Sequence, residues 1–292
     1  MTIKTPYFDI QSIIIFILFL VFSAPLSGQE IQKNSEFDVL IQQLVSDGFE
    51  KKNIKTLFSD KDIFFNPEGV SKFFIHSESS LNYDQFASKK SIAKAKQYLA
   101  KYRTTLDQAQ KTHGVDKTVI TAILLVETRL GTYVGNRTVI NTLATMASLS
   151  DNTLKEKIWN AVPEEKRNNR QLFDKKVKYR SKWAYEELKA LLEYAARQNI
   201  HPKTIRGSYA GAMGIPQFMP SNALKLAEDG NNDGKIDLFT HEDAIFSIAN
   251  YLKHHGWKPG ISREKQKKVL FAYNHSVYYV DILLRISDKL KG

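Results

Sequence analysis

The chain has 292 residues, of which 42% are hydrophobic and 25% are charged, enough to bury a core as one large domain or two modest ones. Lys and Arg number 42 against 31 Asp and Glu, and the net charge of +11 predicts a polyanionic partner. Because the chain has no cysteine, its fold cannot depend on disulfides, and a lipid anchor on an N-terminal cysteine is excluded.

The N-terminus has the pattern of an export signal. An apolar run from Ile13 to Phe22 is followed by mostly small residues at 23–28. Such a run is too short to span a bilayer, so we expect a signal peptide over residues 1–28, with an uncleaved membrane anchor as the alternative. The mature chain is then periplasmic or associated with the cell wall, without a stable membrane anchor. There, anionic wall polymers are more available than nucleic acid.

Helical periodicity dominates the rest of the chain and strand signals are sparse, so we expect a mainly α fold. An N-terminal helical region is expected over 29–84, with a helical pattern at 35–64 and an aromatic segment at 64–80 that is extended or packs as a loop. Residues 85–292 are expected to form the second region. Its helices are expected at 88–112, 117–130, 138–149, 153–160, 175–198, 221–228, 242–255 and 264–290, the last interrupted near Asn274.

Glu127 lies at the end of an apolar helical stripe. With Ile120, Ile123 and Leu124 it falls at i, i+3, i+4 and i+7, which is one face of a helix that Asp116 caps and Gly131 ends. Partial burial disfavours the charged form of a carboxyl group and raises its pKa, as a general acid requires. A solvated Glu in a last helical turn is the alternative.

A loop rich in small residues follows at 206–221. Its glycines and alanines leave space for a ligand to approach the backbone. Ser208, Tyr209, Gln217 and Phe218 add hydrogen-bonding groups and aromatic faces suited to sugars. No Gly-Lys-Ser/Thr ending is present, so the loop is not a phosphate loop. Close helix packing through small residues is the alternative.

Several motifs together resemble one enzyme family. Val126-Glu127-Thr128-Arg129 is followed by Gly131, then by the loop 207–221 and finally by Tyr273-Asn274-His275-Ser276. In this order they resemble the membrane-bound lytic murein transglycosylase B family, and the resemblance covers roughly residues 85–290.

The resemblance implies a lysozyme-like catalytic core and a single catalytic glutamate, Glu127. Its carboxyl is expected to protonate the β-1,4 glycosidic oxygen between MurNAc and GlcNAc. As a base, it then helps the MurNAc 6-hydroxyl close onto C1, which gives a 1,6-anhydro end without water. No cofactor is required for this chemistry. The resemblance also implies a saccharide cleft lined by Ser208, Gln217, Phe218, Tyr273 and Asn274.

A candidate metal loop begins at Asp229. Oxygen ligands at positions 1, 3 and 5, Gly at 6 and a backbone carbonyl at 7 match the start of a calcium loop. Position 12 is Thr240 where an EF-hand has Glu, so Asp243 or Glu242 must close the site, and the resemblance favours Asp243. A structural Ca²⁺ is expected, with Na⁺ or an ion-free polar turn as alternatives. The expected ligands are Asp229, Asn231, Asp233, Lys235 and Asp243.

Two other functions remain open at this point. A hydrolytic muramidase needs a second carboxylate about 5–9.5 Å from the first, and no further acid is linked to a motif. A non-catalytic cell-wall-binding protein would have no need of Glu127. Nucleic acid is not expected, because the aromatic residues do not interleave with Lys and Arg in a base-stacking motif. The expected partner is the peptidoglycan glycan strand, and no motif indicates a protein partner.

Overall fold

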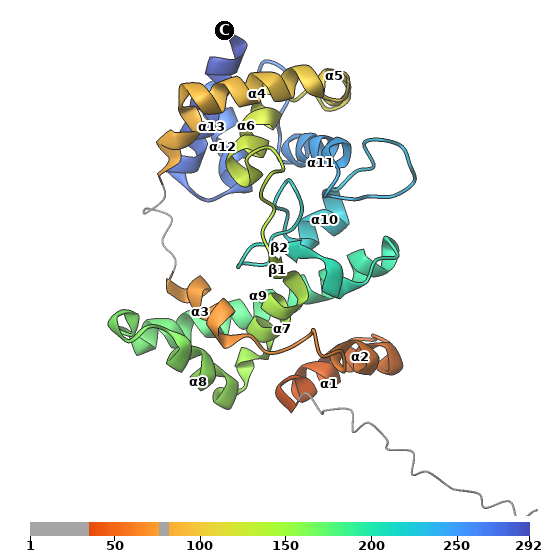
Figure 1. Ribbon diagram of the computed structural model, residues 1–292, viewed down its shortest axis with the longest axis vertical. Helices are drawn as coiled ribbons and strands as arrows, with labels where there is room; N and C mark the ends of the chain where they lie inside the picture. The colour runs from red at the N-terminus through yellow and green to blue at the C-terminus, as the bar shows by residue number, and fades with distance from the viewer. Residues whose placement is uncertain (1–34, 76–81) are drawn as a thin grey trace, which may run out of the picture. The chain divides into compact units, whose positions relative to one another are not determined.

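The computed structural model describes residues 35–75 and 82–292 and confirms a mainly α fold (Figure 1). The predicted signal peptide, residues 1–28, lies outside the described residues. No helix in the described ranges is both long and apolar enough to cross a membrane. The described residues belong to one compact unit, and the boundary expected between 84 and 85 stays a prediction.

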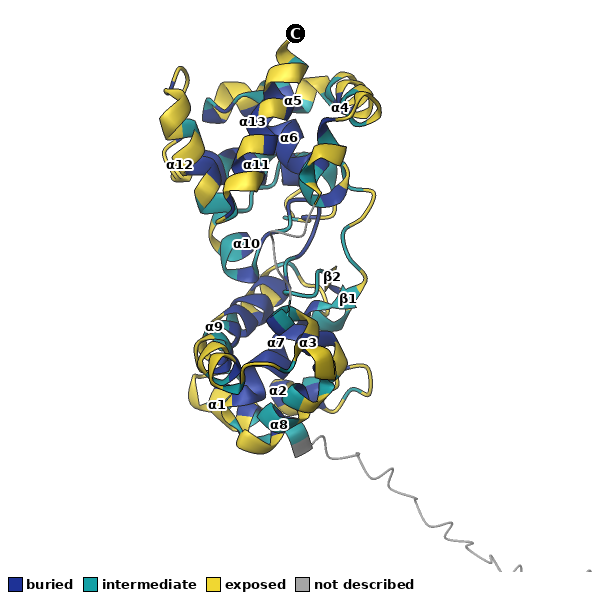
Figure 2. Ribbon diagram, turned by 90° about the vertical axis from the view of Figure 1, so that its left-hand side faces the viewer, coloured by how far each residue is buried: buried dark blue, intermediate teal, exposed yellow. Residues whose placement is uncertain are grey.

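One group of helices is built around α7, Val139–Ala147, in which all nine residues are buried. A helix that is buried on every side needs neighbours on every side. The long helix α9, Arg170–Arg197, packs along it (Figure 2). Asn169 caps α9 by accepting a hydrogen bond from Leu172 N at 2.8 Å. The other helices of the group are α1, Asp38–Ser46; α2, Lys51–Phe58; α3, Pro67–Ile75; and α8, Asn152–Ala161.

A second group surrounds α6, Lys117–Thr128, whose residues from Thr118 to Leu125 are all buried. Helix α13, Val277–Lys291, packs most extensively against α6, and Thr118 and Ser287 join the two helices by a buried hydrogen bond of 2.8 Å. The remaining helices of the group are α4, Lys89–Lys101; α5, Arg103–His113; α11, His241–His254; and α12, Arg263–Tyr273.

Short elements join the two groups. Strands β1, Arg137–Thr138, and β2, Arg206–Gly207, pair antiparallel, with Arg137 opposite Gly207. Helix α10, Pro220–Leu226, packs on both α9 and α11. Single 3₁₀ turns complete the fold: η1, Ser35–Phe37; η3, Tyr83–Ala87; η4, Ser148–Ser150; η5, Glu164–Lys166; and η6, Pro202–Thr204.

Three local expectations were wrong. The helix expected over 88–112 is two helices, because the chain leaves helical geometry at Tyr102, where φ is −104° and ψ is 27°. The aromatic segment at 64–80 contains the helix α3, which begins at Pro67, a residue suited to a first helical position. Asp116 makes no capping hydrogen bond and instead pairs with Lys291 at 2.8 Å.

We predict that Leu188→Ala lowers the free energy of unfolding by about 2–5 kcal/mol, because Leu188 is fully buried in α9. The matched control is Leu172→Ala on the same helix, where the side chain is 47% exposed and the expected loss is within about 0.5 kcal/mol. Urea denaturation followed by circular dichroism measures both. Equal losses in the two variants would contradict the assignment of α9 as a core helix.

Candidate active site

Glu127 lies partly buried in the last turn of α6, directly before an unusual turn. Arg129, Leu130 and Gly131 all have positive φ, at 51°, 64° and 82°. Leu130 N donates to Leu124 O at 2.8 Å, which satisfies a carbonyl at the helix end. Two consecutive non-glycine residues in this region cost on the order of 1–3 kcal/mol each, and such strain is commonly concentrated at functional sites. The helix therefore ends two residues earlier than expected.

Tyr279 holds the carboxyl group of Glu127. Its Oη donates a 2.5 Å hydrogen bond to Glu127 Oε1, and its side chain is fully buried in α13. Burial, and then the negative charge of Glu127, hold the pKa of Tyr279 well above its usual value, so the phenol keeps its proton at neutral pH. The sequence interpretation missed this residue, because the two positions are 152 residues apart and no spacing rule connects them.

Tyr273 ends α12 beside Tyr279, and the two rings are stacked with an interplanar angle of 11°. Tyr273 Oη donates to Pro216 O at 2.6 Å, which ties α12 to the small-residue loop. Burial raises the pKa of Tyr273, and the charge of Glu127 raises it further. Asn274 follows directly and terminates the helix in an extended conformation.

Thr128 fastens the small-residue loop to the helix that carries Glu127. Its buried hydroxyl donates to Ile215 O at 3.0 Å and accepts from Gly131 N at 3.0 Å. Gly214 has a φ of 73°, and a Cβ added there would lie 2.5 Å from the Cβ of Leu238. The glycine is therefore required both by backbone conformation and by close approach. Thr128, like Tyr279, was not among the predicted site residues.

The predicted loop residues take different positions. Gln217 has a φ of 53°, and its Nε2 donates to Val134 O at 3.2 Å and to Gly214 O at 2.9 Å. Ser208 Oγ accepts hydrogen bonds from the backbone of Ala210 and Ala212, at 3.2 and 3.1 Å. Phe218 is only 2% exposed and its ring contacts those of Tyr251 and Tyr273.

These contacts bring Tyr273, Phe218 and the loop together around the residues that hold Glu127. Little of the Phe218 ring is accessible to a sugar. This side chain instead packs against the ring of Tyr273 and supports it. Ser208 Oγ and Gln217 Nε2 hold the loop conformation through these hydrogen bonds. The saccharide contacts of all five predicted side chains stay a prediction.

The candidate metal loop is closed by backbone hydrogen bonds to its own side chains. Asp243, 1% exposed in the first turn of α11, accepts from Gly230 N at 2.8 Å and from Asp237 N at 2.7 Å. Burial raises the pKa of Asp243. Asp229 Oδ2 accepts from Gly234 N at 2.8 Å.

The donor set of this loop is made of oxygen atoms, which suits Ca²⁺. Asn231 Oδ1 and Asp233 Oδ1 each accept a backbone N–H of the same loop at 2.9 Å. In residues 35–75 and 82–292, no group of three His, Cys, Asp or Glu side chains has metal-holding geometry. The expected set also includes the Asn231 amide and the Lys235 carbonyl, and the ion stays a prediction.

Comparison with known families identifies residues 32–269 as a transglycosylase SLT domain. The chain belongs to this family. Membrane-bound lytic murein transglycosylase B from Escherichia coli K12 is 35% identical to this chain over 159 residues. This alignment covers 54% of the chain but only 37% of that relative, so the chain matches little more than a third of the relative's length.

Solved structures confirm the lysozyme-like fold of the SLT domain. SltB1 from Pseudomonas aeruginosa has a TM-score of 0.70 and 22% identity, covering 86% of this chain and 97% of its own. Escherichia coli Slt35 in complex with calcium has a TM-score of 0.66 and 21% identity, covering 90% and 94%. Pseudomonas aeruginosa SltB3 in complex with NAG-anhNAM-pentapeptide has a TM-score of 0.68 and 20% identity, covering 91% and 80%.

We predict that Tyr279→Phe lowers the free energy of unfolding by about 1.5–3 kcal/mol, because it removes a buried hydrogen bond to a charged group. Tyr278→Phe is the matched control, since Tyr278 is the preceding residue and is 65% exposed. Its expected loss is within about 0.5 kcal/mol. Guanidinium denaturation of both variants provides the comparison, and a Tyr279→Phe variant as stable as the wild type would contradict the contact.

Proposed function

We propose that this chain is a peptidoglycan lytic transglycosylase that cleaves the β-1,4 bond between MurNAc and GlcNAc without water. Glu127 donates its proton to the glycosidic oxygen while the bond from that oxygen to C1 of MurNAc breaks. The 6-hydroxyl oxygen of the same MurNAc then bonds to C1 and its proton passes to the Glu127 carboxylate. The products are a 1,6-anhydro-MurNAc end and a free GlcNAc hydroxyl, and Glu127 returns to its starting state.

The observation that carries this proposal is the hydrogen bond by which the Tyr279 phenol holds the carboxyl group of Glu127. Tyr279 fixes one oxygen of the Glu127 carboxyl at 2.5 Å and remains a neutral donor, so the group is oriented without a competing charge. A mechanism with an internal hydroxyl needs only one such group, whereas hydrolysis needs a second carboxylate to activate water or to act as nucleophile.

The remaining parts of the cleft support the same reaction. Family membership over residues 32–269 favours glycan cleavage. We assign saccharide contacts to Ser208, Gln217, Tyr273 and Asn274, with Phe218 behind Tyr273. Such an enzyme acts in the periplasm or at the cell wall. This location agrees with the signal peptide expected over residues 1–28 and with the positive net charge of the chain.

We predict that Glu127→Gln lowers the release of anhydro-muropeptides from purified sacculi by at least about 10²–10⁴-fold, since the amide cannot donate or accept the transferred proton. Glu264→Gln removes the same charge from a side chain that is 78% exposed and is expected to keep full activity. Mass spectrometry of the released fragments distinguishes the outcomes. Reducing ends in place of anhydro ends indicate a muramidase, and unchanged turnover of Glu127→Gln contradicts the assignment of the catalytic acid.

We also infer that the loop from Asp229 to Asp243 binds a structural Ca²⁺. Carboxylate, amide and carbonyl oxygens are the ligands that this ion prefers, and Asp243 already holds both ends of the loop through Gly230 and Asp237. A bound ion would neutralise the carboxylates that this turn brings together. It would stabilise the fold without taking part in the chemistry of Glu127.

For Ca²⁺ at 100 times its Kd, we predict a stabilisation of ~2.7 kcal/mol, which raises Tm by roughly 5–10 °C. Differential scanning fluorimetry with EGTA, CaCl₂ or NaCl measures this shift. Asp229→Asn is expected to abolish it, whereas Glu165→Gln, an exposed control, keeps it. A shift equally large with NaCl assigns the loop to Na⁺, and a Tm insensitive to every ion means that the loop is a polar turn.

A further inference from the structure

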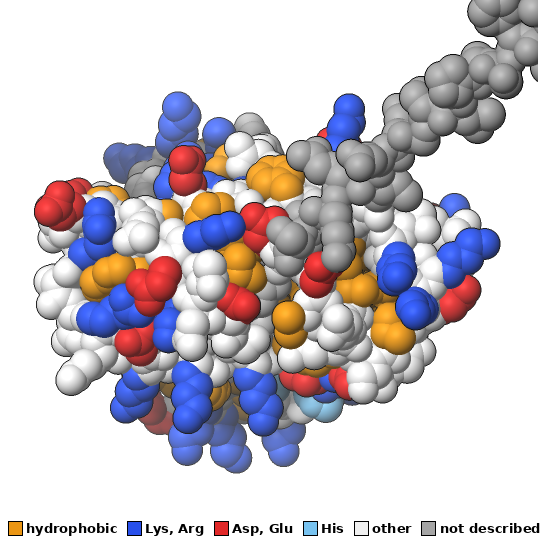
Figure 3. All heavy atoms as spheres, turned by 90° about the horizontal axis from the view of Figure 1, so that it is seen from below, with side chains coloured by type: hydrophobic (Ala, Val, Ile, Leu, Met, Phe, Trp, Pro, Cys, Tyr) orange, Lys and Arg blue, Asp and Glu red, His pale blue; other side chains and the backbone are white. Residues whose placement is uncertain are grey.

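The first half of α9 exposes four lysines together with one aliphatic and one aromatic side chain. At 3.6 residues per turn, these six positions fall within about 160° of the helix circumference and so share one side of α9. Figure 3 shows Lys and Arg side chains in a row along the lower edge of the face seen from below. We call the exposed side of the helix the α9 basic face. Its members are Leu172, Lys175, Lys176, Lys178, Tyr179 and Lys182.

The positive charge of this face is not balanced by the protein. None of its four lysines forms an ion pair with a carboxylate among the described residues. Asp174, the single acid within the same stretch of sequence, is held by Arg170 at 3.1 Å and by Lys155 at 3.5 Å. Glu186 lies one turn beyond the face and pairs with Lys189 at 3.2 Å. The lysines of the face therefore stay available to an external anion.

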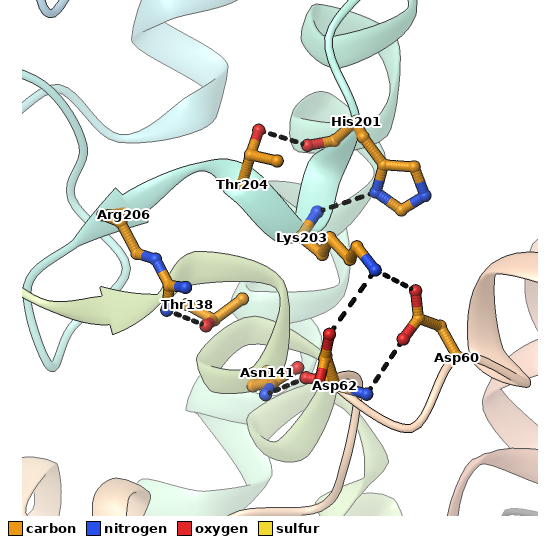
Figure 4. Close-up of polar contacts among 8 residues, drawn as sticks. All are labelled: Asp60, Asp62, Thr138, Asn141, His201, Lys203, Thr204 and Arg206. Carbon is orange, nitrogen blue, oxygen red and sulfur yellow. Dashed lines mark hydrogen bonds and ion pairs between the residues drawn. The ribbon is translucent and has the colours of Figure 1, made fainter.

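Lysines elsewhere around α9 are neutralised by carboxylates. Lys203 Nζ lies 2.6 Å from Asp60 Oδ2 and 3.4 Å from Asp62 Oδ2 (Figure 4). The hydrogen bond from Lys203 lowers the pKa of Asp60, so this pair stays charged. Lys189 Nζ likewise lies 2.8 Å from Asp47 Oδ2. The unpaired lysines are thus a local property of the α9 basic face and not of every lysine in this part of the fold.

Two side chains with apolar surface stand among these lysines. Leu172 is 47% exposed and Tyr179 is 71% exposed. The guanidinium of Arg180 lies 5.8 Å from the centre of the Tyr179 ring and supports it. Lysines beside exposed leucine and tyrosine are typical of a helix that lies in a membrane interface, because ammonium groups meet headgroup phosphates while the apolar side chains enter the acyl boundary.

A hollow of about 230 Å³ extends the apolar part of the face. Leu172 and Lys176 belong to the face and also line this hollow. The rings of Trp159 and Phe173 form an aromatic part of its wall, with their centres 5.0 Å apart. Lys166 adds another exposed lysine to the lining. Apolar surface and positive charge therefore occur together beyond the helix itself.

An anionic bilayer fits these features better than an anionic polymer does. A polymer that carries phosphates or carboxylates would pair with the lysines but would leave Leu172, Tyr179 and the hollow in contact with water. A phospholipid bilayer supplies headgroup phosphates and an apolar phase at the same surface. The combination of side chains therefore favours a lipid surface as the partner.

We propose that the α9 basic face docks this chain on the surface of an anionic phospholipid bilayer. Its four lysines contact the headgroup phosphates, while Leu172 and Tyr179 enter the interface. The lysines supply the long-range attraction, so docking weakens as salt screens their charge. The proposal is independent of the chemistry of Glu127, because it concerns the surface on which the chain lies and not the bond that it cleaves.

Vesicle flotation of the full chain tests the proposal. The probes are vesicles of equal parts phosphatidylglycerol and phosphatidylcholine, and vesicles of phosphatidylcholine alone. The readout is the ratio of binding to the two probes, because the apolar run from Ile13 to Phe22 meets both kinds of vesicle alike. Since each lysine at an anionic surface contributes roughly a fivefold factor, the variant without the four lysines is expected to lower this ratio at least about tenfold. That variant combines Lys175→Gln, Lys176→Gln, Lys178→Gln and Lys182→Gln.

Helix α4 provides the matched control. It has four exposed lysines and no exposed large hydrophobic side chain. The control variant has the same net charge as the α9 variant and is expected to keep the ratio within about twofold, because charges farther than a Debye length from the bilayer are screened. It combines Lys89→Gln, Lys90→Gln, Lys94→Gln and Lys96→Gln.

A third variant, Leu172→Ala/Tyr179→Ala, tests the apolar part of the face. It is expected to lower binding to the anionic vesicles about tenfold, since both side chains lose their transfer out of water. Its binding to soluble polyphosphate is expected to equal that of the wild type, because the lysines are intact. Thermal melts of every variant establish that it is folded.

Three results would overturn the proposal: a wild-type ratio in the α9 lysine variant, an equal loss in the α4 variant, or wild-type binding of the anionic vesicles by Leu172→Ala/Tyr179→Ala. The last result assigns the face to a phosphate-bearing polymer. Glu127→Gln is expected to bind both kinds of vesicle as the wild type does. The failure of the proposed reaction would therefore leave this surface untouched, and the reverse also holds.

Discussion

The hydrogen bond from Tyr279 Oη to Glu127 Oε1 is the contact on which the site depends. It joins the first turn of α13 to the last turn of α6, and it fixes the carboxyl group where the chain makes its strained turn. A phenol suits this position because burial keeps it protonated, so it orients the acid without adding a charge. Tyr273, stacked on Tyr279, carries the same constraint to the loop through Pro216.

Thr128 holds the small-residue loop that runs between the two helical groups. Its hydroxyl joins the end of α6 to Ile215 in the loop, while Ser221 at the start of α10 binds the buried Glu187 of α9. The loop is therefore held at its middle by one helical group and at its end by the other. Glycines occur where these contacts bring backbones together, as at Gly214 against Leu238. The loop geometry is thus imposed by both of its neighbours.

Local patterns in the sequence were sufficient to predict the helices but not the contacts between them. The apolar stripe that ends at Glu127 predicted a partly buried acid on a helix, and the structure places it there. Tyr279 was missed because a partner 152 residues away leaves no trace in spacing. Phe218 was expected to face a sugar, yet it is buried. The sequence pattern around an aromatic residue is the same whether its side chain faces a ligand or packs into the core.

The positive net charge of the chain could be predicted, but not where its Lys and Arg side chains lie on the surface. Net charge alone indicated an anionic partner, and Figure 3 shows Lys and Arg side chains gathered along one edge of the face seen from below. Contacts between distant segments required tertiary structure, as the hydrogen bond from Asn141 to Asp62 O at a separation of 79 residues illustrates.

The left-handed turn at Arg129 and Leu130 lowers the stability of the fold but favours activity. Glycine at either position would relieve backbone strain, at roughly 1 kcal/mol each, and selection for a heat-resistant chain would favour it. The same change would free the residues that follow Glu127 to sample other conformations and would weaken the alignment of its carboxyl group. A protein that keeps arginine and leucine here therefore retains a rigid end to α6 at the expense of melting temperature.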